Sequence, residues 1–252
     1  MTPHAASARP ARTAVVAVTA GAVLLLAGCS LGDGFRKTAS ADTTVTEAVT
    51  AVELAGVRAG SIEVTAGAGP GVTVRRTVHY RASTVPATGQ QVTGGVLTFS
   101  TDCSGGCSVD YRLEVPATAT VRLRSGSGDI RVSGVAGAEL TSDSGDVRAE
   151  RIAGPLKVRT TSGAITGTAL TGPSADVRSA SGDTGLDFAR TPDAVRTEST
   201  SGEVTLKVPR APYRVAVSTT SGSREVTVPT DDAAASRLSV KTTSGDVRVS
   251  AG

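Results

Sequence analysis

Aromatic residues are nearly absent from this chain of 252 residues, which has three tyrosines, three phenylalanines and no tryptophan. Nucleic-acid surfaces usually combine clustered basic residues with stacking aromatic rings, so this composition argues against a nucleic-acid partner. Histidine is equally scarce, with two copies in the whole sequence. His79 has no serine, cysteine or aspartate motif around it, so the sequence predicts no catalytic triad, no catalytic residue and no cofactor.

The N-terminal apolar stretch is too short to span a membrane. It runs from Thr13 to Ala27, follows Arg9 and Arg12, and precedes the first acidic residue, Asp33. A spanning helix needs about 20 apolar residues. A basic start followed by an apolar run of this length is typical of a secretory signal.

The signal ends in the phrase Leu26-Ala27-Gly28-Cys29-Ser30, which resembles the lipobox of bacterial lipoproteins. The resemblance implies that residues 1–28 are removed and that Cys29 becomes a lipidated N-terminus on the outer face of the cell membrane. Loss of Arg9 and Arg12 would reduce the 26 basic residues to 24 against 23 acidic ones. The alternative is an ordinary signal peptide that happens to contain a cysteine.

Two further cysteines, Cys103 and Cys107, are close together in the sequence. Outside the cytoplasm such a pair is expected to form a disulfide. Zinc binding is the alternative, but only His79 is a nearby further ligand. We therefore predict a disulfide and no metal site.

The exported part divides into a tether and one domain. Residues 29–50 are polar with little apolar periodicity, which predicts a flexible tether. Residues 51–252 alternate apolar and polar positions between glycine-rich and proline-rich breaks, which predicts strands and almost no helix. We expect irregular strands and hairpins over 51–116 and a repeat array over 117–252.

A Ser-Gly phrase recurs seven times in the second half of the chain, usually followed by an acidic residue. Its glycines are Gly128, Gly145, Gly163, Gly182, Gly202, Gly222 and Gly245, with spacings of 17 to 23 residues. Recurrence at this period indicates stacked repeats. Counted from each glycine, positions −7, −5, +2 and +4 are mostly aliphatic and position −3 is always Ser or Thr, so all five are predicted to face one interior.

These patterns predict an all-β, β-solenoid or β-helix-like stack with Ser-Gly-Asp turns. A stack of hairpins is the alternative, because a short turn between two inward-facing strands fits either arrangement. Arg224 breaks the rule at position +2, and we expect a bulge or register shift to turn it outward. The final strand, Asp246 to Ser250, has no cap, which predicts an open edge able to pair with another copy.

The turn residues have two interpretations. A tight turn with a positive φ explains the glycines, since phosphate binding would need a helix after the loop. The acidic residues after them suggest a calcium column, but Ala164 and Ser223 interrupt it, so turn stabilisation and pairing with Arg131, Arg148 and Arg248 is favoured. The acidic positions are Asp129, Asp146, Asp183, Glu203 and Asp246.

The lipobox, the strand phrase from Val109 to Pro116 and the repeated Ser-Gly-Asp-Val phrases resemble the bacterial putative-adhesin family of β-helical surface proteins. The resemblance covers about residues 50–252 and implies a non-enzymatic surface protein whose partner is an envelope polymer, another protein or another cell. Two alternatives remain: an envelope-stress accessory that signals to a membrane partner, and a glycan-active β-helix enzyme. The lack of aromatic and carboxylate clusters argues against the enzyme.

Overall fold

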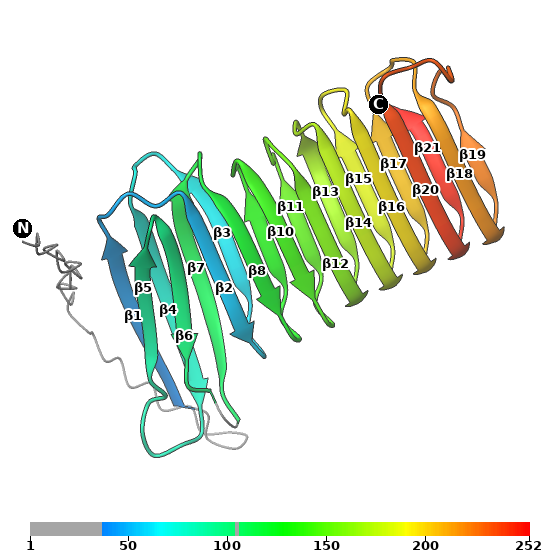
Figure 1. Cartoon of the computed structure of the whole chain (residues 1–252). Coiled ribbons are helices and arrows are strands. Elements are labelled where there is room, and N and C mark those ends of the chain that lie inside the picture. Colours follow the sequence, from blue (N-terminus) through cyan, green and yellow to red (C-terminus); the bar gives the residue numbers. More distant parts are fainter. Residues whose placement is uncertain (1–36, 104–105) are drawn as a thin grey trace, which may run out of the picture.

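The computed structural model describes residues 37–103 and 106–252, which form 21 strands and no helix. The strands make two sheets that face each other across one apolar layer (Figure 1). Sheet A has eleven strands in the order β1-β4-β7-β3-β9-β11-β13-β15-β17-β21-β19. Sheet B has ten, in the order β18-β20-β16-β14-β12-β10-β8-β2-β6-β5.

Seven strands form the N-terminal part of the domain. They are β1 Lys37–Val45, β2 Ala51–Val57, β3 Ile62–Gly67, β4 Val72–Tyr80, β5 Thr88–Thr93, β6 Val96–Thr101 and β7 Ser108–Pro116. Strand β1 pairs antiparallel with β4 over its whole length. The tether expected over 29–50 is therefore wrong for residues 37–45, because the polar alternation of this segment belongs to a mostly exposed edge strand.

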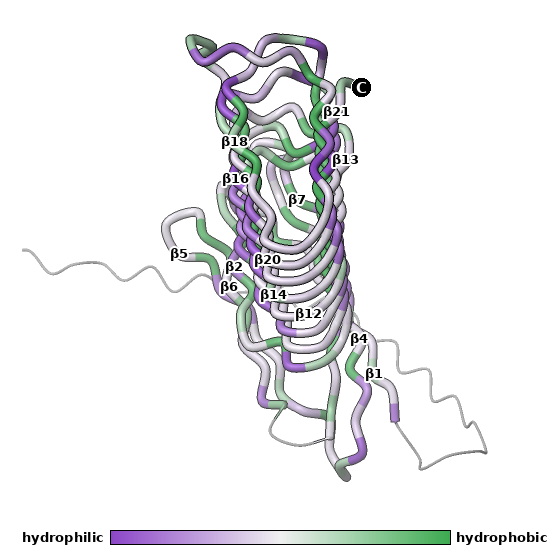
Figure 2. The backbone as a smooth tube through the Cα atoms, turned by 90° about the vertical axis from the view of Figure 1, so that its right-hand side faces the viewer, coloured by the Kyte–Doolittle hydropathy of each residue, from purple (hydrophilic) through white to green (hydrophobic). Residues whose placement is uncertain are grey.

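The repeats form coils, each with one strand in either sheet. Their strands are β8 Thr120–Ser125, β9 Ile130–Ser133, β10 Gly137–Ser142, β11 Val147–Glu150, β12 Leu156–Ser162, β13 Ile165–Leu170, β14 Ser174–Ser181, β15 Thr184–Phe188, β16 Ala194–Ser201, β17 Val204–Val208, β18 Arg214–Ser221, β19 Arg224–Val226, β20 Arg237–Ser244 and β21 Val247–Ala251. Neighbouring coils pair in parallel, as in β12 with β14 and β13 with β15. Figure 2 shows the coils nested one behind another, so the solenoid prediction is confirmed and the hairpin stack is wrong.

The predicted inward positions form the core. Leu123, Leu140 and Val158 at position −5 are fully buried, as are Ile130 and Val147 at position +2. Each fully buried aliphatic side chain contributes about 1.5–3 kcal/mol relative to an exposed one. Six of the seven hydroxyls at position −3 bond to turn backbone, as Ser142 Oγ does when it accepts the N–H of Gly145 at 2.9 Å, whereas Ser179 Oγ is buried without a partner.

Chain order and spatial order differ at both ends of the stack. The last coil in sequence, β20 and β21, lies between the coil β16–β17 and the coil β18–β19. In Figure 1 the red strands β20 and β21 accordingly lie between the yellow β16 and β17 and the orange β18 and β19. At the other end, β8 and β9 follow β6 and β7 in the chain but pair with β2 and β3. The strands β6 and β7 lie on the far side of β2 and β3, toward the N-terminal end of the stack.

This insertion overturns two expectations. The open edge belongs to β18 and β19 and not to the final strand, because β21 pairs with both β17 and β19. Arg224 also needs no register shift, since it aligns directly with Val247. It is exposed because the coil β18–β19 is the outermost one, with nothing stacked over its inward face.

Within residues 37–103 and 106–252, no helix has the length and apolar character needed to cross a bilayer.

Candidate functional site

The predicted site residues lie in different parts of the molecule. Cys29 falls outside the described residues. Cys103 and Cys107 are joined by a disulfide in the loop between β6 and β7, with their Cα atoms 5.7 Å apart. This loop occupies the same place in its coil as a Ser-Gly turn does in the others, because β6 and β7 pair with β2 and β3.

The seven glycines form a ladder along one corner of the stack. A Cβ on Gly182 would collide with the carbonyl oxygen of Gly163, and each of the other six glycines meets the carbonyl oxygen of a glycine in the adjoining coil in the same way. Five of the seven also have a positive φ, for example 115° at Gly182. Gly128 and Gly145 have no positive φ, so at those two positions close approach of the backbones is the reason for glycine.

The acidic residues after the glycines link one coil to the next. Oδ1 of Asp146 accepts the backbone N–H of Ala164 at 3.0 Å, and Oδ1 of Asp183 accepts that of Glu203 at 2.9 Å. Oδ1 of Asp246 accepts the N–H of Ser223 at 2.8 Å. That backbone bond, together with a bond from the Ser223 side chain, lowers the pKa of Asp246.

The acidic residues that follow the repeat glycines form a column along the stack, and the second carboxylate oxygens of this column have their own partners. Asp129 Oδ2 accepts from Arg131 at 2.8 Å, and Asp146 Oδ2 accepts from Arg148 at 3.2 Å. Arg248 pairs with Glu203 of the neighbouring coil at 3.7 Å and, more closely, with Glu225 at 2.9 Å. In the described part of the chain no group of three or more possible metal ligands converges, and the carboxylates of Asp129 and Asp146 already bond to N–H donors.

A member of the same column, Asp110, was missed by the sequence analysis. Asp110 lies in β7 of the outer coil, next to Ser61 of the adjoining coil. It accepts hydrogen bonds from the backbone N–H of Ser61 at 2.7 Å and from the Ser61 hydroxyl at 2.9 Å. The signal was present, because Asp110 precedes buried Tyr111 as Asp129 precedes buried Ile130. Burial opposes ionisation, but the bonds from Ser61 and His79 prevail and lower the pKa of Asp110.

His79 connects this carboxylate to the edge strand. Its Nε2 lies 3.0 Å from Oδ2 of Asp110, and its Nδ1 lies 3.3 Å from the hydroxyl of Thr38. The imidazole thus joins β1, β4 and β7. The backbone N–H groups of the inner strands β4 and β7 serve the ladder on both sides, whereas β1 is an edge strand paired only with β4.

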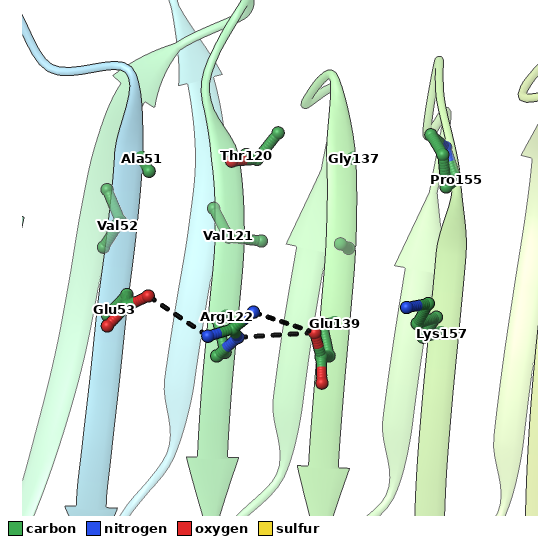
Figure 3. A pocket seen from close by; sticks show the side chains of 11 residues that line it. Ala51, Val52, Glu53, Thr120, Val121, Arg122, Gly137, Glu139, Pro155 and Lys157 are labelled. Carbon is green, nitrogen blue, oxygen red and sulfur yellow. Dashed lines mark hydrogen bonds and ion pairs between the residues drawn. The ribbon is translucent and has the colours of Figure 1, made fainter. Parts of the chain in front are cut away.

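The outer face of sheet B carries the clearest surface feature. A shallow groove with a volume of about 220 Å³ crosses the first halves of β2, β8, β10 and β12. Ala51, Thr120 and Gly137 leave it open on one side (Figure 3). On the other side Arg122 bridges Glu53 and Glu139, with N···O distances of 3.3 Å to each.

Charge is distributed unequally between the two outer faces. The strands of sheet B contain nine basic and four acidic residues. The basic ones are Arg122, Arg124, Lys157, Arg159, Arg178, Arg196, Arg214, Arg237 and Lys241. The strands of sheet A contain nine basic and seven acidic residues, and the acidic column adds to these. The folded domain therefore has a more basic side, the outer face of sheet B.

Register arranges part of this charge into a line that we call the cation row. Arg124, Arg159, Arg178 and Lys241 occupy equivalent positions of β8, β12, β14 and β20, with Thr141 and Glu198 at the intervening positions. All four basic side chains are exposed. The row follows the long axis of the stack, because parallel in-register strands place equivalent residues side by side.

The two carboxylates that line the groove are not placed as the catalytic pair of a glycosidase would be. Glu53 and Glu139 are the carboxylates that line it, yet the guanidinium of Arg122 stands between them and bonds to both. A glycosidase needs the bond to be cleaved in that intervening position. Both carboxylates are also partly exposed, at 45% and 34%.

Fold and surface together define the chain as a β-solenoid protein with long exposed faces. Residues 91–250 match the family model described as Toastrack DUF4097, and the chain belongs to this family. The match begins within β5 and includes every Ser-Gly turn.

A solved structure of similar fold agrees with this architecture. A putative adhesin from Bacteroides fragilis is similar with a TM-score of 0.51 at 15% identity, over 87% of this chain and 99% of that one. A putative adhesin from Parabacteroides distasonis gives a TM-score of 0.49 at 14% identity, over 86% and 98%. No curated protein is significantly similar to the chain.

Proposed function

We propose that this chain is a non-enzymatic, lipid-anchored surface protein that binds an envelope polymer or another surface component through its outer β faces. The cation row and the groove on sheet B are the observation that carries the proposal. They form an extended, exposed and basic surface on a rigid stack. The name adhesin given to proteins of similar fold agrees with such a role.

The N-terminal end supports attachment at Cys29. Strand β1 starts at Lys37, eight residues after that cysteine. Eight residues reach at most about 28 Å. The lipid would therefore hold the N-terminal end of the stack close to the outer face of the cell membrane. The later coils, with most of the cation row, would lie farther from the lipid along the axis of the stack.

The anchor is tested by the Cys29→Ala substitution in the native cell. Wild-type protein should incorporate labelled palmitate and sediment with membranes, because two or more acyl chains hold a protein firmly to a bilayer. The variant should lose the label and appear in the medium. A variant that still sediments with washed membranes would contradict lipid attachment at this residue.

Binding is tested separately with purified envelopes. Full-length Cys29→Ala protein should be retained by envelopes from the native cell, since the proposed surface lies within the solenoid. Heat-denatured protein serves as the control for non-specific retention. If the folded protein is retained no better than the denatured control, the binding function is wrong, whatever the result for the anchor.

A further inference from the structure

We propose that the cation row of sheet B is a track for a linear polyanion with phosphate groups along its backbone. This inference rests on the proposed binding function and names the chemistry of the partner. The argument depends on the spacing, the unneutralised charge and the flatness of the row.

Spacing comes from the solenoid itself. Neighbouring strands lie about 4.8 Å apart, so the positions from Arg124 on β8 to Lys241 on β20 extend over roughly 24 Å. Strand pairing fixes their order without a register shift among β8, β10, β12, β14, β16 and β20. A polymer with charge in its backbone at short intervals can therefore meet several of these cations at once.

Much of the positive charge in this area has no acidic partner. Within the described part of the chain, the ion pairs of sheet B involve Arg122, Arg178 and Arg196. Arg124, Arg159 and Lys241 take part in none of them, and neither does Lys157 beside the groove. Arg178 is the exception in the row, since it pairs with Asp176 and Glu198. The three unpaired cations of the row can attract a polyanion at the surface, and binding would release counterions from both partners.

The flat surface favours a polymer over a single anion. The cation row borders no deep cavity, and one exposed cation contributes only about 0.2–1 kcal/mol to an ion pair. Several such contacts made by one chain reinforce each other, because each later contact is intramolecular.

The neighbouring hydroxyls favour phosphate. Thr161, Thr200 and Thr243 are exposed two residues beyond the row on β12, β16 and β20, where they can donate to phosphate oxygens. Arginine adds a planar fork that matches two phosphate oxygens. No outward-facing residue of the sheet B repeat strands is aromatic, so the track offers no platform for stacking bases.

The test uses full-length protein carrying Cys29→Ala, with linear inorganic polyphosphate as the probe. A track variant combines Arg124→Gln, Arg159→Gln and Lys241→Gln. A control variant combines Arg75→Gln, Arg112→Gln and Lys207→Gln, which removes the same charge from the exposed face of sheet A. Thermal melting first establishes that both variants fold.

The track variant should lose about tenfold or more in affinity, the sum of three exposed contacts. The control variant should lose less than about threefold, and the salt dependence of binding should weaken only in the track variant. Equal losses in both variants would overturn the track, because net charge alone would then explain binding. Binding of orthophosphate as tight as that of polyphosphate would overturn the preference for a polymer, and equally tight binding of poly-L-glutamate would overturn the preference for phosphate.

Failure here is distinguishable from failure of the proposed function. If native envelopes retain both triple variants equally while polyphosphate does not bind, the protein binds its envelope through another surface and the track is wrong. If envelopes retain neither the parent protein nor the variants, the binding function itself is wrong.

Discussion

The regular coils and the N-terminal cap of strands β1 to β7 are built on different principles. In the coils each layer repeats the contacts of the one before: aliphatic columns, a glycine ladder and carboxylates that bond to the next backbone N–H. The cap uses unlike parts, including antiparallel strands, a disulfide and a histidine between a carboxylate and a threonine.

This difference bears on how the two ends of the solenoid protect their edge strands from pairing with other chains. A repeated coil always leaves an unpaired edge for another coil, which is an aggregation hazard. At the N-terminal end β1, β4 and β5 cover that edge with antiparallel strands. At the other end the edge strand β19 is only three residues long and has the inward charge of Arg224, both known ways to discourage pairing.

The largest effect is expected where the coils approach each other most closely. Gly182→Ala should cost about 3 kcal/mol or more in the free energy of unfolding, because it combines a positive φ with a backbone collision. Gly185→Ala in the same coil should stay within about 1 kcal/mol, since nothing lies within 4 Å of the added Cβ. Denaturant unfolding of both variants measures the difference.

Equal costs at Gly182 and Gly185 would contradict the ladder. They would mean that the corner relaxes to admit a methyl group, and that the recurrence of glycine there has another origin.

The second effect concerns the cap alone. Replacing Cys103 and Cys107 together by Ser should lower the stability by about 2 kcal/mol, the loop-closure value for a ring this small. Because each coil contacts only its neighbours, hydrogen exchange should rise in β6 and β7 and stay unchanged beyond β10. A uniform rise along the whole stack would show that cap and coils unfold as one unit.

Sequence periodicity predicts the coils far better than the cap. Columns at −7, −5, +2 and +4 depend only on contacts between neighbouring coils, so alternation and a turn residue suffice to predict them. The placement of β20 and β21 inside β18 and β19 is visible in the sequence as Arg224, which stands where the inserted coil has the apolar Val247. For Arg224 the sequence predicted a local distortion, whereas the cause is its position at the end of the stack.

Surface features follow the same rule. The partners of Asp129 and Asp146 include the predicted Arg131 and Arg148, which lie two residues away on the same strand. The basic character of sheet B depends on which outward residues share a face, and that requires the register. Likewise Asp110 and His79 lie 31 residues apart and meet only through antiparallel pairing.

The third effect is a core substitution that we expect to preserve or raise stability, whereas most core substitutions lower it. Arg76 in β4 is only 8% exposed, and its Nε and Nη1 have no partner. Burial lowers its pKa, which shows that the site disfavours the charge. Arg76→Met should leave stability unchanged or raise it by about 1 kcal/mol, whereas Val74→Ala on the same buried face should lower it by about 2 kcal/mol.

Thermal unfolding of the two variants distinguishes a tolerated charge from a needed one. If Arg76→Met destabilises the chain as much as Val74→Ala does, the guanidinium makes a required contact in the cap, and the contrast with the apolar columns of the coils disappears.

The smallest effect tests what cap and coils share. Asp110 in the cap and Asp246 in the coils each accept bonds from a serine of the next coil, and both have a lowered pKa. Such a group stabilises the fold fully above its unfolded pKa of about 3.9 and loses this contribution as the pH falls through the folded value. Wild-type stability should therefore decline below about pH 4, and Asp110→Asn or Asp246→Asn should each flatten that decline. A flattening for Asp246→Asn alone would show that His79 and the edge strands make Asp110 independent of the column, and that the cap resembles a coil in position only.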